Sequence, residues 1–299
     1  MNTRRLNFLA VGALLLTALL WGISYSAQAE AMNFLPPLFF VSLRYFLGSF
    51  LLLFPVLWRR GSGKTESKFS KKVLFSGVAG GFFLAGGEIL QQYGLLYTSA
   101  GKAGFLTALY VIMIPVIEVL LGKKSSLKIW SAALLSVAGT YLLCFNGEFN
   151  SIAGNLGDVL ILICALFFAF QFIVIGKYAP EVDALEFAGI QFFTVAVISG
   201  IAAPLSGESC TIGQIVQCSV PLWFCGGIAI GFACTVQVAA QKVVHPATAS
   251  IILSMASVFA VLWGWLLRDE VYTPANLIGC AIIFSAVVLV ELPERITKN

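Results

Sequence analysis

The chain has 299 residues, of which 59% are hydrophobic and only 11% are charged, and its formal net charge at pH 7 is +4. A soluble domain carries about 25% charged residues, because it needs them to cover its surface in water. The composition therefore excludes a water-soluble globular protein and predicts an all-α integral membrane protein. The small net charge gives no indication of a nucleic-acid partner.

Ten segments are long and apolar enough to cross a bilayer, for which a helix needs about 20 apolar residues. In chain order they are 7–28, 36–58, 72–97, 102–121, 128–145, 156–177, 185–205, 219–242, 247–267 and 273–291. These segments use most of the chain and leave no room for a soluble domain between them.

The Lys and Arg residues predict how the segments are oriented, because cytoplasmic loops carry an excess of positive charge. With the N-terminus in the cytoplasm, all but three of the 18 Lys and Arg residues lie on the cytoplasmic side. Lys102 and Arg268 lie outside, and Arg44 lies within a segment. We therefore expect both termini in the cytoplasm and the chain in the cytoplasmic (inner) membrane of a bacterium.

The cysteines and the histidine do not form a pattern that is typical of a metal or haem site. The seven cysteines include no C-x-x-C pair, and His245 is the single histidine. We expect no metal and no cofactor. Cys210 and Cys218 share one loop, and the sequence leaves open whether they form a disulfide.

Polar side chains inside the first four segments are candidates for a binding site, because a polar group in lipid is costly unless it faces a cavity or a partner. At 1.5 Å per residue, Glu88 and Arg44 lie about 14 Å and about 12 Å below the same membrane face, so they could pair. The pair is either a substrate or proton site at Glu88 gated by Arg44, or a structural ion pair. The other candidates in this half are Trp21, Ser24, Gln28, Gln91, Gln92 and Tyr110, with Pro115 as a candidate hinge.

The second half supplies aromatic and amide candidates but no buried ion pair. These candidates are Phe170, Gln171, Gln191, Gln237 and Gln241. The alternative interpretations are that aromatic residues near segment ends anchor the helix at the interface and that nearby glycines serve helix packing. Glu118 is interpreted as a structural residue that extends toward Lys123 and Lys124 at the cytoplasmic end of its helix.

The two halves of the chain repeat each other. At a shift of 146 residues Gly80 and Gly81 align with Gly226 and Gly227, and Gln91 aligns with Gln237; at a shift of 147 Arg44 aligns with Gln191. Each repeat has five segments, an odd number, so the second enters the membrane inverted relative to the first. The expected architecture is ten transmembrane helices in two inverted five-helix repeats, residues 1–150 and 151–299.

These features resemble the EamA-type branch of the drug/metabolite transporter superfamily over essentially the whole chain. The residues that carry the resemblance are Trp21-Gly22, Arg44, Tyr97-Thr98-Ser99-Ala100, Pro115, Gly157-Asp158, Gln237 to Gln241, Glu270 and Gly279. The resemblance implies a central cavity lined by helices 1–4 and 6–9, with helices 5 and 10 at the periphery. The sequence departs from the family pattern at Ala256 and Lys124, where the family often has an acid.

The leading hypothesis is a secondary transporter that exports amino acids or other small amphipathic metabolites by alternating access. Its partners would be the lipid bilayer and a small-molecule substrate, and protons coupled through Glu88 are a weaker proposal. The alternative is an integral-membrane enzyme or a sensor without transport activity. An enzyme is disfavoured because Glu88 has no second buried acid at its depth and the single histidine lies in a loop. The oligomeric state is left open.

Overall fold

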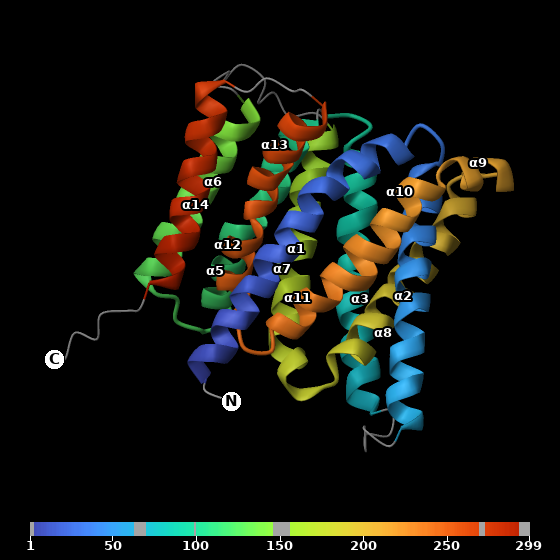
Figure 1. Cartoon of the computed structure of the whole chain (residues 1–299), viewed down its shortest axis with the longest axis horizontal. Helices are drawn as coiled ribbons and strands as arrows, with labels where there is room; N and C mark the ends of the chain where they lie inside the picture. Colours follow the sequence, from blue (N-terminus) through green and yellow to red (C-terminus); the bar gives the residue numbers. More distant parts are fainter. Residues whose placement is uncertain (1–2, 63–69, 99, 146–155, 269–272, 293–299) are drawn as a thin grey trace.

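The computed structural model describes residues 3–62, 70–98, 100–145, 156–268 and 273–292, and every regular element in these ranges is helical. The elements are α1 (Thr3–Ala31), α2 (Pro37–Gly61), α3 (Lys71–Gly94), α4 (Ala100–Ala108), α5 (Tyr110–Leu120), α6 (Leu127–Phe145), α7 (Leu156–Tyr178), the 3-10 helix η2 (Ala179–Glu181), α8 (Ala184–Leu205), α9 (Ile212–Gln217), α10 (Ser219–Trp223), the π-helix η3 (Phe224–Cys234), α11 (Thr235–Ala240), α12 (Pro246–Leu253), α13 (Met255–Arg268) and α14 (Pro274–Glu291). Figure 1 shows them as one bundle in which α1 begins and α14 ends at the same end, which we call the N-terminal end. The opposite end is called the distal end.

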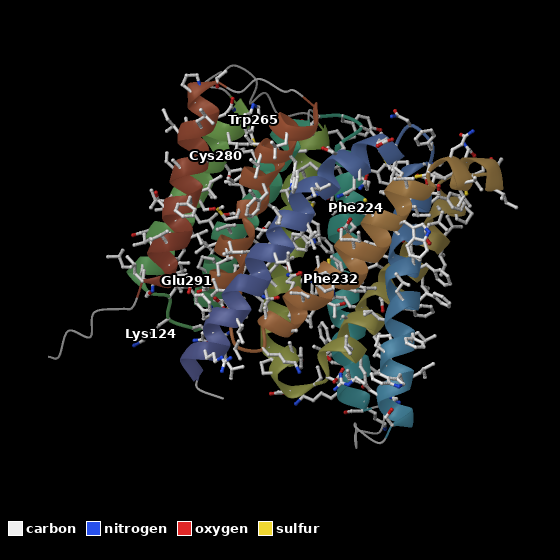
Figure 2. All side chains as sticks on the ribbon, in the orientation of Figure 1. Lys124, Phe224, Phe232, Trp265, Cys280 and Glu291 are labelled. Carbon is white, nitrogen blue, oxygen red and sulfur yellow. The ribbon has the colours of Figure 1, made fainter. Side chains whose placement is uncertain are left out.

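The described residues contain ten helical stretches that are long and apolar enough to cross a membrane, as predicted. Their bounds differ from the predicted ones by at most four residues, in the sixth span, which is observed at 156–181 and predicted at 156–177. The fourth span consists of α4 and α5, the eighth of α10, η3 and α11, and the ninth of α12 and α13. Large apolar side chains such as Phe232 and Trp265 are exposed on the outside of the bundle, where lipid would surround them (Figure 2).

The two halves of the bundle contact each other in the way that an inverted repeat requires. The second span contacts the seventh (α2 with α8), and the fifth contacts the tenth (α6 with α14), so each of these pairs is its own counterpart. Contacts of the third span with the sixth (α3 with α7) are matched by contacts of the eighth with the first (η3 and α11 with α1). The predicted inverted architecture is confirmed, whereas the predicted boundary at residue 150 lies outside the described residues.

Glycines bring the two halves close together in both repeats, at positions that are one residue apart in the alignment. A Cβ atom at Gly81 of α3 would lie 2.6 Å from the carbonyl oxygen of Gln191 in α8. In the other half, a Cβ atom at Gly226 of η3 would lie 2.8 Å from the carbonyl oxygen of Arg44 in α2. Small residues permit this approach between helices in a membrane, so the repeated glycines set the spacing at the centre of the bundle.

Two spans are interrupted near the middle of the bundle. The fourth span breaks at Leu109, between α4 and α5, and the ninth breaks at Ser254, between α12 and α13. Pro115, the candidate hinge, lies inside α5, which continues through it. A hinge role for Pro115 stays a prediction.

The helices α6 and α14 lie together at one edge of the bundle (Figure 1). Gly139 and Gly279 allow their backbones to meet, because a Cβ atom at Gly139 would lie 2.8 Å from the carbonyl oxygen of Gly279. The other eight spans surround the centre, which is the arrangement that the resemblance implied.

Candidate functional site

A cavity of about 110 Å³ lies between the two halves of the bundle. All of its lining residues come from the first four spans and from the sixth to ninth spans. Ten of the predicted site residues line it: Trp21, Ser24, Gln28, Arg44, Glu88, Gln91, Tyr110, Gln171, Gln191 and Gln237. The fold therefore gathers most of the polar residues of the spans around one space.

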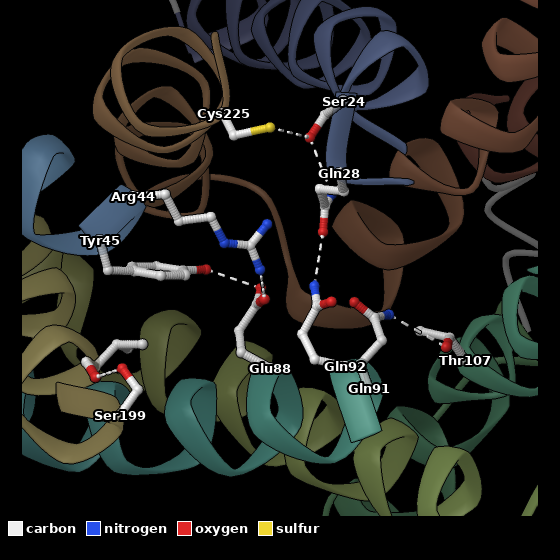
Figure 3. A network of polar contacts seen from close by, with 11 residues as sticks. Ser24, Gln28, Arg44, Tyr45, Glu88, Gln91, Gln92, Thr107, Ser199 and Cys225 are labelled. Atoms are coloured by element: carbon white, nitrogen blue, oxygen red, sulfur yellow. Dashed lines mark hydrogen bonds and ion pairs between the residues drawn. The ribbon is translucent and has the colours of Figure 1, made fainter. Parts of the chain in front are cut away.

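An ion pair between Arg44 and Glu88 forms the charged side of the cavity (Figure 3). Tyr45 donates a hydrogen bond of 2.8 Å from its hydroxyl to Oε1 of Glu88. The Arg44 side chain is 3% exposed and the Glu88 side chain 13%. The guanidinium carbon of Arg44 also lies 5.0 Å from the centre of the Phe40 ring, a cation–π distance. The pairing that their similar depths predicted is thus present, with Tyr45 and Phe40 as additional partners.

Amide and hydroxyl groups continue from the ion pair toward α1 and α4. Gln92 donates through Nε2 to Oε1 of Gln28 at 3.2 Å, and Gln28 donates to the Ser24 hydroxyl at 3.0 Å (Figure 3). Gln91 donates through Nε2 to the hydroxyl oxygen of Thr107 at 3.3 Å. Gln92 itself is 1% exposed and does not line the cavity. Successive residues on a helix point about 100° apart, so Gln91 faces the cavity while Gln92 holds Gln28 in place.

Aromatic rings form the walls of the cavity. The indole Nε1 of Trp21 donates to the carbonyl oxygen of Ala229 at 3.2 Å, which ties the first span to the eighth. The Tyr110 and Phe172 rings stack at a centroid distance of 5.2 Å. Phe170 was predicted in the cavity, but it stacks on Phe83 at 5.2 Å and is not among the lining residues.

Helix geometry explains why Phe170 was misplaced. The cavity face of α7 consists of Phe168, Gln171 and Phe172, which are spaced by three and four residues and therefore share one side of the helix. Phe170 falls between them in the sequence and points away from that side. Its hydrophobicity gave no indication of this, because every face of α7 is largely apolar.

The second half contributes neutral amides with unused hydrogen-bonding capacity. Within the described residues, Gln191 Oε1 and Gln237 Nε2 are buried and have no hydrogen-bond partner. Gln191 is 1% exposed and Gln237 is 2% exposed, and both line the cavity. Leaving a buried polar atom unpaired costs about 1–3 kcal/mol. Because both atoms are themselves buried, a bound molecule could pair with them only if the amide side chains turned toward the cavity.

Gln241 was predicted in the cavity, but it does not line it. It follows the last residue of α11, one turn beyond Gln237, and is 2% exposed. Neither of its side-chain polar atoms has a partner in the part of the chain that the structure describes. Its one-turn spacing from Gln237 led to the prediction, but the cavity ends before it.

Several lining residues had no clear indication in the sequence. Tyr45, Thr107, Cys225, Ser254 and Ser257 all line the cavity. Thr107 lies three residues before Tyr110 on the same side of its span, a spacing that could have identified it. Tyr45 directly follows Arg44, and a single aromatic residue in an apolar segment does not indicate its partner.

Ion pairs join the two halves at the N-terminal end of the bundle. The Arg60 guanidinium donates two hydrogen bonds, of 3.0 Å and 2.7 Å, to Oε1 of Glu186. Nη1 of Arg59 lies 3.1 Å from Oδ2 of Asp183. Lys72 pairs with Glu181. In each pair the cation belongs to the first half and the acid to the second. These pairs therefore hold the first half to the second on this side of the cavity.

Glu118 adds a further link at this end. It was predicted to be a structural residue that extends toward Lys123 and Lys124, and its side chain is only 2% exposed. Its Oε1 lies 3.2 Å from Lys123 Nζ and 3.2 Å from Nε2 of His245, the residue before α12. The predicted contact with Lys123 is therefore confirmed, whereas the contact with His245 of the second half is one that no local pattern indicates.

The distal end is joined by a different set of contacts. Oε2 of Glu208, in the segment between α8 and α9, accepts hydrogen bonds from the backbone N–H groups of Leu38 (3.0 Å) and Phe39 (3.3 Å). Its Oε1 accepts from the Tyr93 hydroxyl at 3.3 Å. A carboxylate is stabilised at the N-terminus of a helix by the unpaired amides and the helix dipole, so Glu208 of the second half caps α2 of the first.

The described residues contain no group of three His, Cys, Asp or Glu side chains that could hold a metal ion. Cys210 and Cys218 are both free thiols.

Sequence comparison finds the same repeat. The sequence model of the EamA-like transporter family matches residues 8–145 and again residues 155–292. An uncharacterized transporter of Archaeoglobus fulgidus is 30% identical over 282 residues, which is 93% of this chain and 84% of the relative. An S-adenosylmethionine/S-adenosylhomocysteine transporter of Chlamydia muridarum is 23% identical, with 92% of each chain covered.

Comparison with solved structures supports the fold. A protein of known crystal structure superposes with a TM-score of 0.77, covering 95% of this chain and 98% of its own, at 19% identity. At that identity the likeness concerns the arrangement of the helices.

Proposed function

This chain belongs to the EamA-like transporter family, and we propose that it is a secondary transporter that exports small amphipathic, amino-acid-like metabolites by alternating access. The observation that carries the proposal is the cavity between the two inverted halves, with an ion pair on one side and unpaired amides on the other. Polar groups inside a membrane are costly and are by default candidates for a functional site. We propose the cavity residues described above as the substrate site.

The contacts at the two ends support alternating access. Ion pairs such as Arg60–Glu186 join the halves at the N-terminal end, and Glu208 joins them at the distal end. Inverted repeats can exchange conformations, so one end opens while the other closes. In this proposal the contacts at each end break in turn, and the substrate site between them stays in place.

The size of the cavity favours a small substrate. Pockets for drug-sized ligands are about 300 Å³ or larger, whereas this cavity is about 110 Å³. S-adenosylmethionine, which the name of the chlamydial relative gives as its substrate, is much larger than a single amino acid. We therefore propose a substrate of single amino-acid size for this chain.

We propose that both termini lie in the cytoplasm and that the membrane is the inner membrane of a bacterium. The support is the excess of Lys and Arg at the N-terminal end, which includes Arg59, Arg60 and Lys72. Export is proposed from the resemblance to the family. Coupling to protons through Glu88 is the weaker part of the proposal, and a variant Glu88→Gln with unchanged pH-driven transport would contradict it.

The proposal can be tested with purified protein in liposomes. We expect counterflow of at least one radiolabelled amino acid, and we expect Arg44→Gln combined with Glu88→Gln to reduce it to the level of empty liposomes. Ser285→Ala is the matched control, because Ser285 lies on exposed α14 and hydrogen-bonds only within that helix among the described residues. If no amino acid or small metabolite moves in protein-containing liposomes, the proposal is wrong, and an enzyme or a sensor would be the better hypothesis.

A further inference from the structure

We propose that Glu118 and His245 form a proton-binding site at the N-terminal end of the bundle, outside the cavity, and that a proton on His245 holds this end closed. The inference rests on the proposed function, which assigns the contacts at the two ends to opening and closing. It adds which of these contacts responds to pH, and in which direction.

The carboxylate of Glu118 is buried at a point where the two halves meet. Its side chain is 2% exposed, and its Oε1 lies 3.2 Å from Nζ of Lys123 and 3.2 Å from Nε2 of His245. Lys123 follows α5 in the first half, whereas His245 precedes α12 in the second half. One carboxylate oxygen therefore has a cation from its own half and an imidazole from the other half.

The start of α12 holds His245 in this position. His245 is the N-cap residue of α12 and has an extended backbone, and Pro246 is the first residue of the helix. Pro246 packs so closely on Gly176 of α7 that a Cβ atom at Gly176 would overlap the proline ring. The His245 side chain is 49% exposed, so protons can reach it from the aqueous side while its Nε2 stays against Glu118.

The two partners of Glu118 respond differently to pH. A lysine keeps its charge at neutral pH, whereas histidine is the side chain that ordinarily changes charge between about pH 5 and pH 8. A contact between two charged groups is about twice as strong as one in which a partner is neutral. Loss of the His245 proton therefore weakens the contact between the halves and leaves the Lys123 contact within the first half in place.

The N-terminus of α12 strengthens this dependence. A cation is unfavourable at a helix N-terminus, because the unpaired amides there carry partial positive charge. His245 is therefore stabilised in its charged form only while Glu118 lies beside it. Separation of the halves removes Glu118 and favours release of the proton, so acid on this side favours the closed end and alkali favours its opening.

Other charged groups at this end do not take part in the contact. The elements that pack on α5 and α12 include α1, α6, α7 and α14. The other described charged residues that these elements and the adjoining turns carry at this end are Arg5, Lys124, Lys128, Lys177, Lys242 and Glu291. Within the described ranges, the ion pairs of Glu118 are those with Lys123 and His245 alone.

The repeat does not place the same site at the distal end. At the shift of 146 residues Glu118 aligns with Gly264 and His245 aligns with Ser99, and neither of these residues carries a charge. The neighbouring contact between the halves at the N-terminal end, Arg60 with Glu186, depends on an arginine, which keeps its charge at all accessible pH values. The single histidine of the chain therefore makes one end of the bundle sensitive to protons near neutral pH.

Hydrogen–deuterium exchange of the purified full chain, followed by mass spectrometry, tests the inference. The measured quantity is the protection of the backbone amides of residues 119–126 and 241–249, corrected for the intrinsic pH dependence of exchange. From about pH 6 to about pH 8.5 we expect protection to fall by about twofold to fivefold, the effect of a partly exposed ion pair. A flat profile in the unaltered protein would overturn the inference.

Variants assign the pH response to the two residues. His245→Gln and Glu118→Gln should each remove the pH dependence, and His245→Arg, which keeps its charge, should hold protection high at every pH. Lys242→Gln is the matched control, because it removes a charge from the same turn but leaves Glu118 and His245 in contact, and it should keep the response of the unaltered protein. A response that persists in His245→Gln would overturn the inference.

The pH profile of the unaltered protein keeps the test valid if a variant fails to fold. Counterflow in liposomes together with a flat exchange profile would leave the proposed function standing and overturn this inference. A pH response through His245 in a protein that moves no solute would instead contradict the proposed function and support the proton-binding site.

Discussion

The two halves of the cavity have equivalent backbones but different chemistry. In the first half Arg44 and Glu88 form an ion pair, and in the second half the aligned residues are Gln191 and Cys234, which are neutral. The close contacts between the halves are nevertheless alike, since Gly81 approaches the backbone of Gln191 as Gly226 approaches that of Arg44. The inverted repeat therefore preserves helix packing, while a few side chains decide what each half can bind.

This comparison also separates stability from function. Removing one partner of a buried ion pair strongly destabilises the protein, because the other charge is left buried without a partner. An unpaired buried amide, by contrast, costs stability as long as it remains unpaired. The charged half is therefore expected to be sensitive to single substitutions, and the neutral half to tolerate apolar ones.

Removal of one charge from the first half is expected to have the largest effect. Arg44→Gln leaves Glu88 without its cation, and we expect the free energy of unfolding to fall by about 2–3 kcal/mol. This is somewhat less than the loss of a fully enclosed pair, because Glu88 faces the cavity. Equilibrium unfolding in detergent micelles measures the change.

The double variant is the control for that loss. Arg44→Gln with Glu88→Gln removes both charges, and we expect it to lower the free energy of unfolding by less than about 1 kcal/mol. A double variant as unstable as the single one would show that the Arg44 side chain stabilises the bundle through packing and not through its charge.

Alanine at the close glycines should cost about the same in both halves. Gly81→Ala and Gly226→Ala each place a Cβ atom against a backbone carbonyl oxygen, at 2.6 Å and 2.8 Å. We expect each to lower the free energy of unfolding by about 1–3 kcal/mol, as overpacking does. Thermal unfolding in detergent would measure both.

Gly12→Ala is the matched control, because a Cβ atom there would meet no heavy atom within 4 Å among the described residues. Alanine also favours helix over glycine by up to about 1 kcal/mol. Unequal losses at Gly81 and Gly226 would contradict the expectation that the two backbone contacts are of similar strength.

Gln191→Leu is expected to change stability by less than about 1 kcal/mol in either direction. The substitution removes a buried carbonyl oxygen that has no partner within the described chain, so the loss of the amide is offset by the removal of an unsatisfied group. A comparison of the free energies of unfolding of Gln191→Leu and Arg44→Gln would show the difference between the halves directly. A loss as large as that of Arg44→Gln would contradict the view that the second half is a neutral subsite.

Thiol labelling tests the inverted orientation of the two halves, and we expect it to leave the stability of the protein unchanged. Burial and the nearby Cys225 and Glu30 raise the pKa of Cys218 to about 11, and burial also raises the pKa of the more accessible Cys210. A raised pKa keeps a thiol protonated at neutral pH, so the reactive thiolate appears only as the pH rises. We expect Cys210 to react with a membrane-impermeant maleimide at pH 7.5 and Cys218 to react slowly, with its rate rising toward pH 11.

Single-cysteine variants allow the two faces to be compared. Cys210 follows the seventh span, and a cysteine introduced at Gly61 marks the corresponding end of the second span. If the halves are inverted and the N-terminus is cytoplasmic, the reagent labels Cys210 in intact cells and labels Gly61→Cys only after permeabilisation. Labelling of both positions from outside would contradict the orientation.

The spans could be predicted because they depend on hydropathy averaged over many residues. The ion pair could be predicted because it depends on the depth of two residues in the membrane. Hydropathy is summed over about 20 residues, so errors at single positions cancel, and the observed spans match the predicted ones within four residues. The depth of Arg44 and Glu88 follows from the helical rise alone. Their pairing therefore required no knowledge of how the helices are rotated.

The direction of individual side chains could not be predicted in the same way. Gln91 and Gln92 are adjacent, yet only Gln91 lines the cavity, and Phe170 points away while Gln171 faces it. Each step along a helix turns the side chain by about 100°, so a modest rotation of the helix exchanges these roles. Neighbouring helices set that rotation.

By itself, the sequence determined that this chain lies in a membrane, that it has ten spans, and that its halves are inverted, because composition, span length and an odd repeat suffice for these conclusions. The tertiary structure alone decided that Tyr45 joins the ion pair, that His245 covers Glu118, and that Gln191 and Gln237 keep unpaired atoms beside the cavity. Each of these depends on residues brought together from distant spans. Such contacts follow from helix rotation and packing, which a one-dimensional pattern does not specify.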